Sequence, residues 1–339
     1  MKPLAVTGAA LVGALLVASC SKPAPATSAQ QTLKFSVLSA EDQQSMARVW
    51  GPLFADMEKA TGLKIQPFYA TNNASLVEAM CFKQTDAGWF SALPALEATR
   101  RANAEVIGRI LTNGDKGAYQ SVLIVRKGSG ITLDDVFKCN KKLNFGIGDA
   151  KSTSGTLAPM AYLFVPRNIE PAECFKTVKS ASHQANFLGV ANGLLDVATN
   201  NTIGLQFYAR DYPDKAKQLD ILWSSPELPE SSIIVRKDLD PAVKEKIRQF
   251  FLSYGQAPGA EGERQKAELQ LLKYTGFAPA DNSYLDPVRQ MEAATDLAEA
   301  KHSGNQAKIA AAQKTFDAVQ TEMAAKNPAS PPVSLPPAK

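Results

Sequence analysis

The sequence contains little of what metal centres, enzymes and nucleic-acid surfaces require. Its 339 residues include only two histidines, His183 and His302, and four cysteines, none with the spacing of metal ligands. We therefore expect no metal site and no cofactor. The net charge is only +4, without a basic stripe, which argues against nucleic acid as a partner and is compatible with a small anionic ligand. A G-x-S-x-G nucleophile elbow is also missing, so the sequence offers little for an enzyme.

The first 20 residues have the pattern of a secretory signal peptide with a lipobox. Lys2 precedes a largely apolar run from Leu4 to Val17, and Ala-Ser-Cys follows. Residues 1–20 are thus a predicted lipoprotein signal peptide, and Cys20 is the residue expected to carry a lipid anchor. The alternative is a plain signal peptide in which Cys20 is incidental. No other segment approaches the ~20 apolar residues of a membrane span, so we expect a lipid-anchored body on the periplasmic or cell-surface side.

Three cysteines remain in the mature chain, so at most one disulfide can form in a compartment that permits disulfides. Cys139 lies just before a strand expected at 143–147, and Cys174 lies at the start of a strand expected at 175–180. A helix between the two strands makes this a βαβ unit, in which both strands start near the same edge of the sheet. We expect a disulfide between Cys139 and Cys174 and a free, buried Cys81.

Between Leu33 and about Ala300, short β-type runs alternate with amphipathic helical stretches, which indicates an α/β fold with mainly parallel sheets. The length exceeds what one core comfortably supports, so two lobes are expected. Two similar runs, Ser121–Lys127 and Ser232–Asp238, are predicted to cross between the lobes beside a ligand cleft. The expected organisation is a linker at 21–32, a first lobe at 33–123 and 231–326, a second lobe at 124–230, and a Pro-rich tail at 327–339.

Some elements are predicted with definite bounds. They include a helix at Gln43–Thr61 and a strand at Ser232–Arg236. A long region from Tyr284 to Lys326, rich in Ala, Glu, Gln and Lys, is expected to be helical with an interruption near Gly304. We expect these extra C-terminal helices to pack across the first lobe.

Residues 144–165 combine a β-type run with a cluster of hydroxyl residues that opens an apolar helical run. The first backbone N–H groups of a helix lack intrahelical partners, and the helix dipole places partial positive charge there. Ser152, Thr153 and Ser154 add three hydroxyls, and Gly155 allows the backbone to approach a phosphate-sized group. This pattern predicts an anion cradle; the alternative is an ordinary Ser/Thr N-cap.

Several segments, taken in order, resemble a known family. They are Ser39-Ala-Glu-Asp-Gln-Gln, WGPLFADMEKATG at 50–62, FYAT at 68–71, DAGWF at 86–90, AYQSVLIV at 118–125, Gly148–Gly155, Ser180-Ala-Ser-His, and LDVATNNT at 195–202. The set resembles the solute-binding proteins of phosphonate, phosphite and phosphate ABC importers over about 35 to 300. The resemblance implies the type II periplasmic binding protein fold, with two βαβ lobes joined by two crossing strands.

The resemblance also implies a set of ligand-binding residues. Ser152, Thr153 and Ser154, with nearby backbone N–H groups, are implied to bind the phosphonyl oxygens. Tyr119 from the first lobe and His183 from the second are implied to join them. His183 follows a strand, so its ring could donate to an oxyanion, and a bound dianion would favour its protonated form. The alternatives are a satisfied loop or core residue for His183 and a packed aromatic for Tyr119.

Two positions depart from the aminoalkylphosphonate-binding members of this family. Asn73 stands where those members carry an aromatic residue, and Ser231 stands where they carry the aspartate that pairs with the ligand's ammonium group. A serine cannot neutralise a buried cation, although the adjacent Glu230 could substitute if the backbone register differs by one. We therefore favour phosphite, phosphate or a small alkylphosphonate over 2-aminoethylphosphonate. Trp89 and Phe90 are candidates for an apolar cleft wall, the alternative being core.

The function expected from these features is that of a non-catalytic receptor, whose lobes close on a small phosphorus oxyanion and deliver it to a membrane permease. Asp149 and Asp196 are candidates for an acceptor that would select protonated oxyanions. One alternative is a sensory binding protein for the same ligands, and a weaker one is an extracytoplasmic enzyme on phosphate or phosphonate esters. We expect a monomer whose partners are the ligand, the ABC permease and, through Cys20, the membrane.

Overall fold

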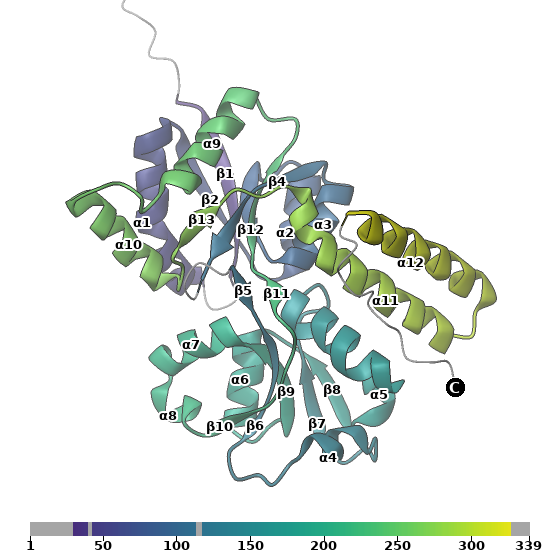
Figure 1. Cartoon of the computed structure of the whole chain (residues 1–339). Coiled ribbons are helices and arrows are strands. Elements are labelled where there is room, and N and C mark those ends of the chain that lie inside the picture. The colour runs from purple at the N-terminus through teal and green to yellow at the C-terminus, as the bar shows by residue number, and fades with distance from the viewer. Residues whose placement is uncertain (1–29, 40–42, 113–116, 327–339) are drawn as a thin grey trace, which may run out of the picture. The chain divides into compact units, whose positions relative to one another are not determined.

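The computed structural model describes residues 30–39, 43–112 and 117–326 (Figure 1). All the elements given below lie in the unit Gln31–Lys339. The predicted signal peptide, Cys20, most of the linker and the Pro-rich tail lie outside the described residues. No described helix is long and apolar enough to cross a membrane.

The larger sheet has six strands and combines N-terminal with C-terminal segments. Its order is β13 (Gly276–Ala278), β4 (Ala104–Leu111), β12 (Ser232–Arg236), β3 (Ala87–Phe90), β1 (Thr32–Leu38) and β2 (Lys64–Ala70). β1 pairs parallel with β2 and β3, whereas β12 and β13 pair antiparallel with their neighbours. The sheet is therefore mixed, not mainly parallel as predicted.

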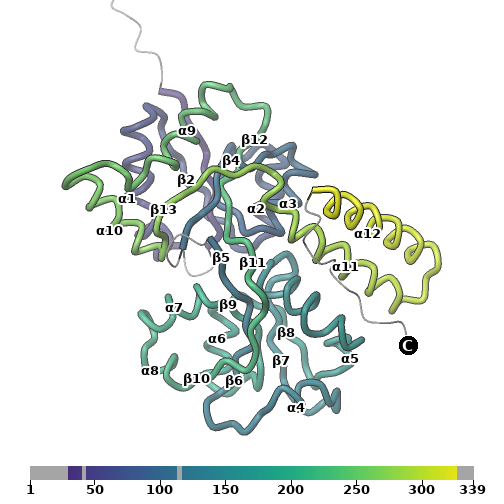
Figure 2. The backbone as a smooth tube through the Cα atoms, viewed as in Figure 1, coloured from purple at the N-terminus to yellow at the C-terminus, as the bar shows by residue number. Residues whose placement is uncertain are grey.

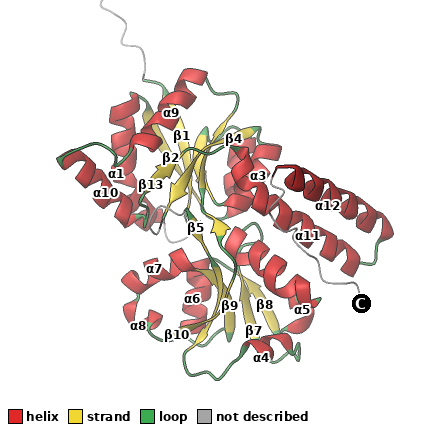
Figure 3. Ribbon diagram, in the orientation of Figure 1, coloured by secondary structure: helices red, strands yellow, loops and turns green. Residues whose placement is uncertain are grey.

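Helices cover both faces of the larger sheet (Figure 3). α1 (Gln43–Thr61), α9 (Pro241–Ser253) and α10 (Ala260–Leu271) share one hydrophobic cluster, while α2 (Asn73–Cys81), α3 (Ala92–Arg101) and the short η4 (Asn282–Leu285) share another. Side chains of β12 alternate between the clusters, because successive residues of a strand point to opposite faces. Ile233 and Val235 enter the first cluster and Ile234 enters the second.

The smaller sheet has five strands, all from the middle of the chain. Its order is β10 (Leu219–Ser224), β6 (Ser121–Arg126), β9 (Val197–Asn201), β7 (Asn144–Ile147) and β8 (Thr177–Ser180). Its helices are α4 (Leu133–Phe137), η1 (Thr153–Leu157), η2 (Met160–Phe164), η3 (Val165–Arg167), α5 (Pro171–Cys174), α6 (His183–Ala191), α7 (Thr202–Asp211) and α8 (Pro213–Ala216). A disulfide joins Cys139 to Cys174, the pairing expected from the sequence. Cys81 is free, but it is half-buried and not buried as expected.

The connections between the sheets differ from the predicted crossing strands. β6, within the predicted crossing at Ser121–Lys127, lies wholly in the smaller sheet, and β12 lies wholly in the larger one. The crossing is made by a two-stranded ribbon of β5 (Ala118–Tyr119) and β11 (Leu228–Pro229), which run side by side in Figure 2. β6 is not a crossing strand because it is hydrogen-bonded on both edges, by β9 and β10, and therefore lies inside a sheet.

The C-terminal region forms two long helices, α11 (Asp286–His302) and α12 (Gln306–Lys326), which pack against each other. The interruption lies at Gly304, as predicted, where a φ of 65° favours glycine. α11 contacts α3 of the larger lobe and also η1, η2 and the connecting β11. The C-terminal helices therefore reach both lobes, and not the first lobe alone.

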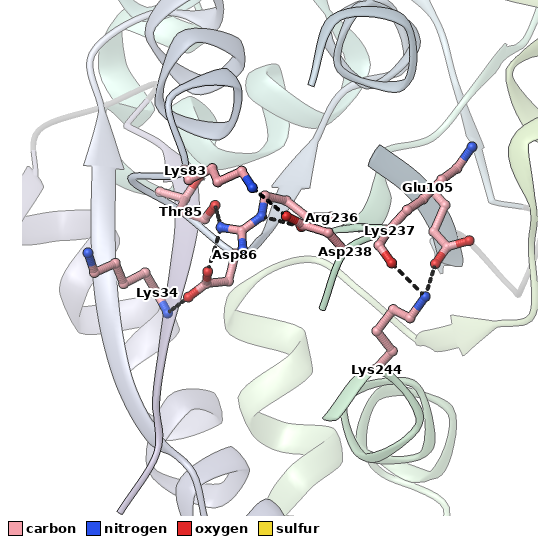
Figure 4. A network of polar contacts seen from close by, with 9 residues as sticks. All are labelled: Lys34, Lys83, Thr85, Asp86, Glu105, Arg236, Lys237, Asp238 and Lys244. Atoms are coloured by element: carbon pink, nitrogen blue, oxygen red, sulfur yellow. Dashed lines mark hydrogen bonds and ion pairs between the residues drawn. The ribbon is translucent and has the colours of Figure 1, made fainter. Parts of the chain in front are cut away.

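Ion pairs fix the end of β12 that lies away from Ser231 (Figure 4). The Arg236 guanidinium, only 13% exposed, donates to Asp86 and to Asp238, at 2.8 Å in each case. Asp86 also accepts from the Lys34 backbone N–H at 2.9 Å. Because these bonds join β12 to the segments that begin β1 and β3, they hold the register of the strand that follows Ser231.

Candidate functional site

A cavity of about 300 Å³ lies between the two sheets and is lined by residues of both lobes. Seven of the ten predicted ligand-binding residues line it: Asn73, Trp89, Tyr119, Ser152, Ser154, His183 and Ser231. Thr153, Gly155 and Phe90 are not among the lining residues. No group of three or more His, Cys, Asp or Glu side chains that could hold a metal ion occurs in the described part of the chain.

Helix N-termini from both lobes converge on this cavity. The N-cap residues of α2, α3, η1, α6 and α7 all line it, and they are Asn72, Ser91, Ser152, Ser182 and Asn201. Four of these side chains accept a backbone N–H of their own helix, and Ser91 does not. The unpaired N–H groups and the helix dipoles favour negative charge at this point. Of these caps only Ser152 was predicted from the sequence, although a Ser or Asn before each helical run was a usable signal.

The predicted cradle residues have different roles in the structure. Ser152 Oγ accepts the Gly155 N–H at 2.9 Å, so Ser152 is an N-cap, while its hydroxyl proton is available to a ligand. Thr153 is fully buried, and its Oγ1 accepts the Leu93 N–H of α3 at 2.8 Å, which joins the two lobes. Ser154 Oγ lies 3.2 Å from His183 Nε2.

Gly155 meets a steric requirement that the sequence did not predict. A Cβ at this position would lie 2.8 Å from both Gly148 Cα and Ser152 Oγ. The Gly155 carbonyl also accepts the Gly148 N–H at 2.9 Å. The absence of a side chain is therefore required for packing of the loop against itself.

His183 and Tyr119 both lie in the wall of the cavity. Burial lowers the pKa of His183 to about 4, against a smaller opposing effect of Asp149, so the imidazole is neutral at pH 7. Its Nδ1 has no hydrogen-bond partner among the described residues. Burial, with the charge of Glu230 second, raises the pKa of the Tyr119 hydroxyl, which is hydrogen-bonded to Ser154. We call Ser152, Ser154, Tyr119 and His183 the hydroxyl side of the cavity.

Asp149 and Asp196, the two predicted candidates for a ligand acceptor, lie in different places in the structure. Asp149 lines the cavity, where its Oδ1 accepts the Asn73 side-chain amide at 3.0 Å. Asp196 is not among the lining residues; its carboxylate accepts both the backbone and the side-chain N–H of Asn144, at 2.7 and 2.9 Å. Asp196 therefore stabilises the start of β7.

Glu230 and Ser231, which were alternatives in the prediction from the sequence, both line the cavity. The Ser231 N–H and hydroxyl both donate to Glu230 Oε1, at 2.9 and 3.0 Å. Trp89 and Tyr274 line the same cavity, whereas Phe90 is fully buried in the core, as the alternative interpretation held. We call Glu230, Ser231, Trp89 and Tyr274 the carboxylate side of the cavity.

Comparison with known proteins identifies the family. The family model described as "ABC transporter, phosphonate, periplasmic substrate-binding protein" matches residues 35–285. The phosphonates-binding periplasmic protein of Escherichia coli is 39% identical over 270 residues, which cover 79% of this chain and 78% of the relative. The phosphate-import protein PhnD of Mycolicibacterium smegmatis is 27% identical over 259 residues, covering 72% and 80%.

Solved structures agree with this assignment. The binding protein component of an ABC phosphonate transporter from Pseudomonas aeruginosa has a TM-score of 0.81 and 33% identity, covering 88% of this chain and 99% of that one. PhnD1 of Prochlorococcus marinus, solved with methylphosphonate, has a TM-score of 0.67 at 20% identity, covering 77% and 97%, and shows the fold alone. The chain belongs to the family of periplasmic substrate-binding proteins of phosphonate ABC transporters.

Proposed function

We propose that the cavity binds a small phosphorus oxyanion, with its oxygens on the hydroxyl side, and that the protein delivers this ligand to the permease of an ABC importer. The observation that carries the proposal is the convergence of Ser152, Ser154, Tyr119 and His183 with several helix N-termini on one cavity. Neutral hydroxyl and amide donors surround an oxyanion from several directions and bind it without a dedicated cation. One relative is named a phosphonates-binding periplasmic protein and another a phosphate-import protein, and both names support the same ligand class.

Three contacts across the cleft support binding by hinge closure. Asn73 of the larger lobe donates to Asp149 of the smaller one, and the Leu93 N–H donates to Thr153. An ion pair of 3.3 Å between Lys151 and Glu97 adds a third contact. A ligand that bridges the lobes would add to these contacts and favour the closed arrangement.

The test is isothermal titration of the protein, freed of ligand by unfolding and refolding, with phosphate, phosphite, methylphosphonate and sulfate. We expect one-to-one binding of at least one phosphorus anion and weaker binding of sulfate. Ser154→Ala should weaken it about 10-fold or more, because a hydrogen bond to a charged group contributes about 1.5–3 kcal/mol. The matched control is Ser129→Ala, at an exposed turn. Silence from all the phosphorus anions would overturn the proposal.

We also propose that Cys20 carries a lipid that anchors the protein to the membrane and that the protein is a monomer. The lipobox-like Val17-Ala-Ser-Cys20 and the Pro- and Ala-rich segment after it support the anchor. In a cell fractionation experiment, Cys20→Ser should move the protein from the membrane fraction to the soluble fraction. Sedimentation of the protein without residues 1–20 tests the monomer, and a dimer mass would contradict it.

A further inference from the structure

The cavity contains an apolar region that belongs neither to the hydroxyl side nor to the carboxylate side. Its residues come from α1, from α7 and from the residue that follows α10, and thus from both lobes. None of these side chains carries a hydrogen-bond donor, so an oxyanion gains nothing from them. We call this region the apolar arm of the cavity, and its residues are Met46, Val49, Ile203, Phe207 and Leu272.

The apolar arm is formed by one face of each of two helices. On α7, Ile203 and Phe207 are separated by one helical turn, and on α1 the same holds for Met46 and Val49. Side chains with these spacings lie on the same side of a helix. Met46, Ile203 and Phe207 are only half-buried, so they present apolar surface to the cavity. Apolar walls beside a few convergent polar groups are typical of sites for organic ligands.

The arm begins next to the hydroxyl side, at the N-terminus of α7. The Asn200 side-chain amide, just before α7, donates to the His183 carbonyl at 2.8 Å. The N–H of Gln120, the residue after Tyr119, donates to Thr202 Oγ1 at 3.1 Å. The first two turns of α7, which carry both arm residues of this helix, extend ~11 Å from that point. A group attached to an anion on the hydroxyl side can therefore follow α7 along the arm.

The far end of the arm is bounded by the end of α7 and by the larger lobe. Arg210, which lines the cavity and is exposed, donates two hydrogen bonds to Asp211. These bonds lower the pKa of Asp211 against the effect of burial, and the charges of Arg48 and Lys273 lower it further. Arg48 lies on α1 and Lys273 follows Leu272, so the end of α7 faces the elements that form the opposite wall (Figure 1). Three cations therefore act on one carboxylate at this end, which favours the approach of an anion.

The cavity is larger than an unsubstituted oxyanion requires. Its volume is about 300 Å³, whereas a dry apolar cavity of ~150 Å³ is large enough to bind benzene. Phosphate or phosphite alone would leave the arm to water, which finds no hydrogen-bond partner on these side chains. Filling the arm with a hydrocarbon group would remove apolar surface from water and favour binding.

We propose that the apolar arm is a subsite for the organic substituent of a phosphonate, and that it favours an uncharged hydrocarbon chain of about four carbon atoms, held between α1 and α7. This inference rests on the proposed function and deepens it, because it names the substituent that the anion carries. It also goes beyond the compact anions expected from the sequence, since those would occupy the hydroxyl side alone. The arm supplies no donor and no charge, so a hydrocarbon substituent is preferred there to a polar one.

The first experiment compares methylphosphonate and n-butylphosphonate on the ligand-free protein by isothermal titration. The two probes share the same head group and differ by three methylene groups. We expect n-butylphosphonate to bind at least 10-fold more tightly, because each methylene that is buried in the arm favours binding. Equal or weaker binding of n-butylphosphonate would overturn the inference alone and leave the proposed function intact. No binding of either probe would overturn both.

The second experiment assigns the preference to the two walls of the arm. Phe207→Ala on the smaller lobe and Met46→Ala on the larger lobe should each reduce the ratio of the two affinities about 5-fold or more. Methylphosphonate binding should change far less, since its single carbon atom does not reach the arm, and it also shows that each variant is folded. The matched control is Phe82→Ala, whose ring is 71% exposed outside the cavity lining. An unchanged ratio in both arm variants would overturn the subsite.

Discussion

The hydroxyl side and the carboxylate side of the cavity are built on opposite principles. On the hydroxyl side, the hydroxyl groups lie at hydrogen-bond distance from neighbouring protein groups. Ser152 Oγ accepts the Gly155 N–H, and Ser154 Oγ lies beside His183 Nε2. A hydroxyl that accepts a hydrogen bond keeps a proton to donate. On the carboxylate side, Glu230 Oε2 and Trp89 Nε1 are buried without partners among the described residues. His183 Nδ1 on the hydroxyl side is also without a partner among the described residues, but only the carboxylate side holds a buried acidic group.

This difference separates affinity from specificity. Neutral hydrogen-bond donors at helix N-termini bind any oxyanion of suitable size and distinguish poorly between such anions. A buried charge without a partner penalises every ligand that fails to supply the complementary group. The two sides together place oxyanion donors and a buried carboxylate in the wall of one cavity.

The largest effect is expected when a charge like that of Glu230 is placed on the hydroxyl side. Ser154→Asp would put a carboxylate against the bound oxyanion, and two unit charges at 4 Å repel by about 4 kcal/mol at an effective dielectric constant of 20. The affinity for the best phosphorus anion should therefore fall about 1,000-fold in isothermal titration. Ser129→Asp, on an exposed turn, is the control. Retention of tight binding would show that the anion lies elsewhere.

The sequence predicted the whole hydroxyl side, whereas on the carboxylate side it predicted Ser231 and Trp89, gave Glu230 only as an alternative and missed Tyr274; the reason is physical. Ser152, Thr153 and Ser154 are consecutive, so one local pattern of strand, hydroxyls and helix identifies them. The place of Glu230 in the cavity wall depends on the short ribbon of β5 and β11. Each strand of this ribbon has only two residues and therefore leaves no periodic signal in the sequence.

In the fold, too, local features were predicted from the sequence and long-range features were not. α1 and β12 have the predicted bounds, because the amphipathic pattern of one and the apolar run of the other are local properties. The antiparallel pairing of β12 with β3 and β4 depends on how the chain returns from the smaller lobe, and no local pattern encodes it. For the same reason β6 could not be told from a crossing strand.

A second effect, smaller than the first, is expected from Tyr119, which stands between the two sides. Tyr119→Phe removes one donor to the oxyanion and should weaken binding about 30-fold, within the 1.5–3 kcal/mol of a hydrogen bond to a charged group. Tyr284→Phe is the matched control, since its hydroxyl donates to the Gly117 carbonyl and Tyr284 is not among the lining residues. Equal losses in both variants would mean that Tyr119 acts through packing.

The two sides should also affect stability in opposite directions as pH changes. The pKa of His183 is about 4 in the folded protein and near 6.5 in the unfolded chain, so unfolding takes up a proton between these values and stability falls as pH falls. The pKa of Glu230 is raised above 4.5 in the folded protein, so the stability that its protonated form provides is lost as pH rises above that value.

Thermal unfolding of the ligand-free protein between pH 4 and pH 7 tests these signs. Relative to the unsubstituted protein, His183→Gln should gain melting temperature as pH falls, and Glu230→Gln should gain it as pH rises, each by a few degrees. His302→Gln, at a residue outside the cavity lining, is the control. Profiles that change in parallel for both variants would contradict the opposite ionisation of the two sides.

The smallest effect on ligand affinity is expected at Asn73, which lines the cavity and also contacts the other lobe. Its side-chain amide donates to Asp149 across the cleft, and its Oδ1 is buried without a partner among the described residues. Asn73→Ala should lower affinity about 5-fold, the effect of one ordinary hydrogen bond of about 1 kcal/mol. Because this bond forms only when the lobes meet, koff should rise while kon stays constant in stopped-flow measurements. Asn192→Ala, at an exposed position on the smaller lobe, is the control and should change neither rate. A change confined to kon would mean that Asn73 guides the ligand into the cavity and does not hold the lobes together.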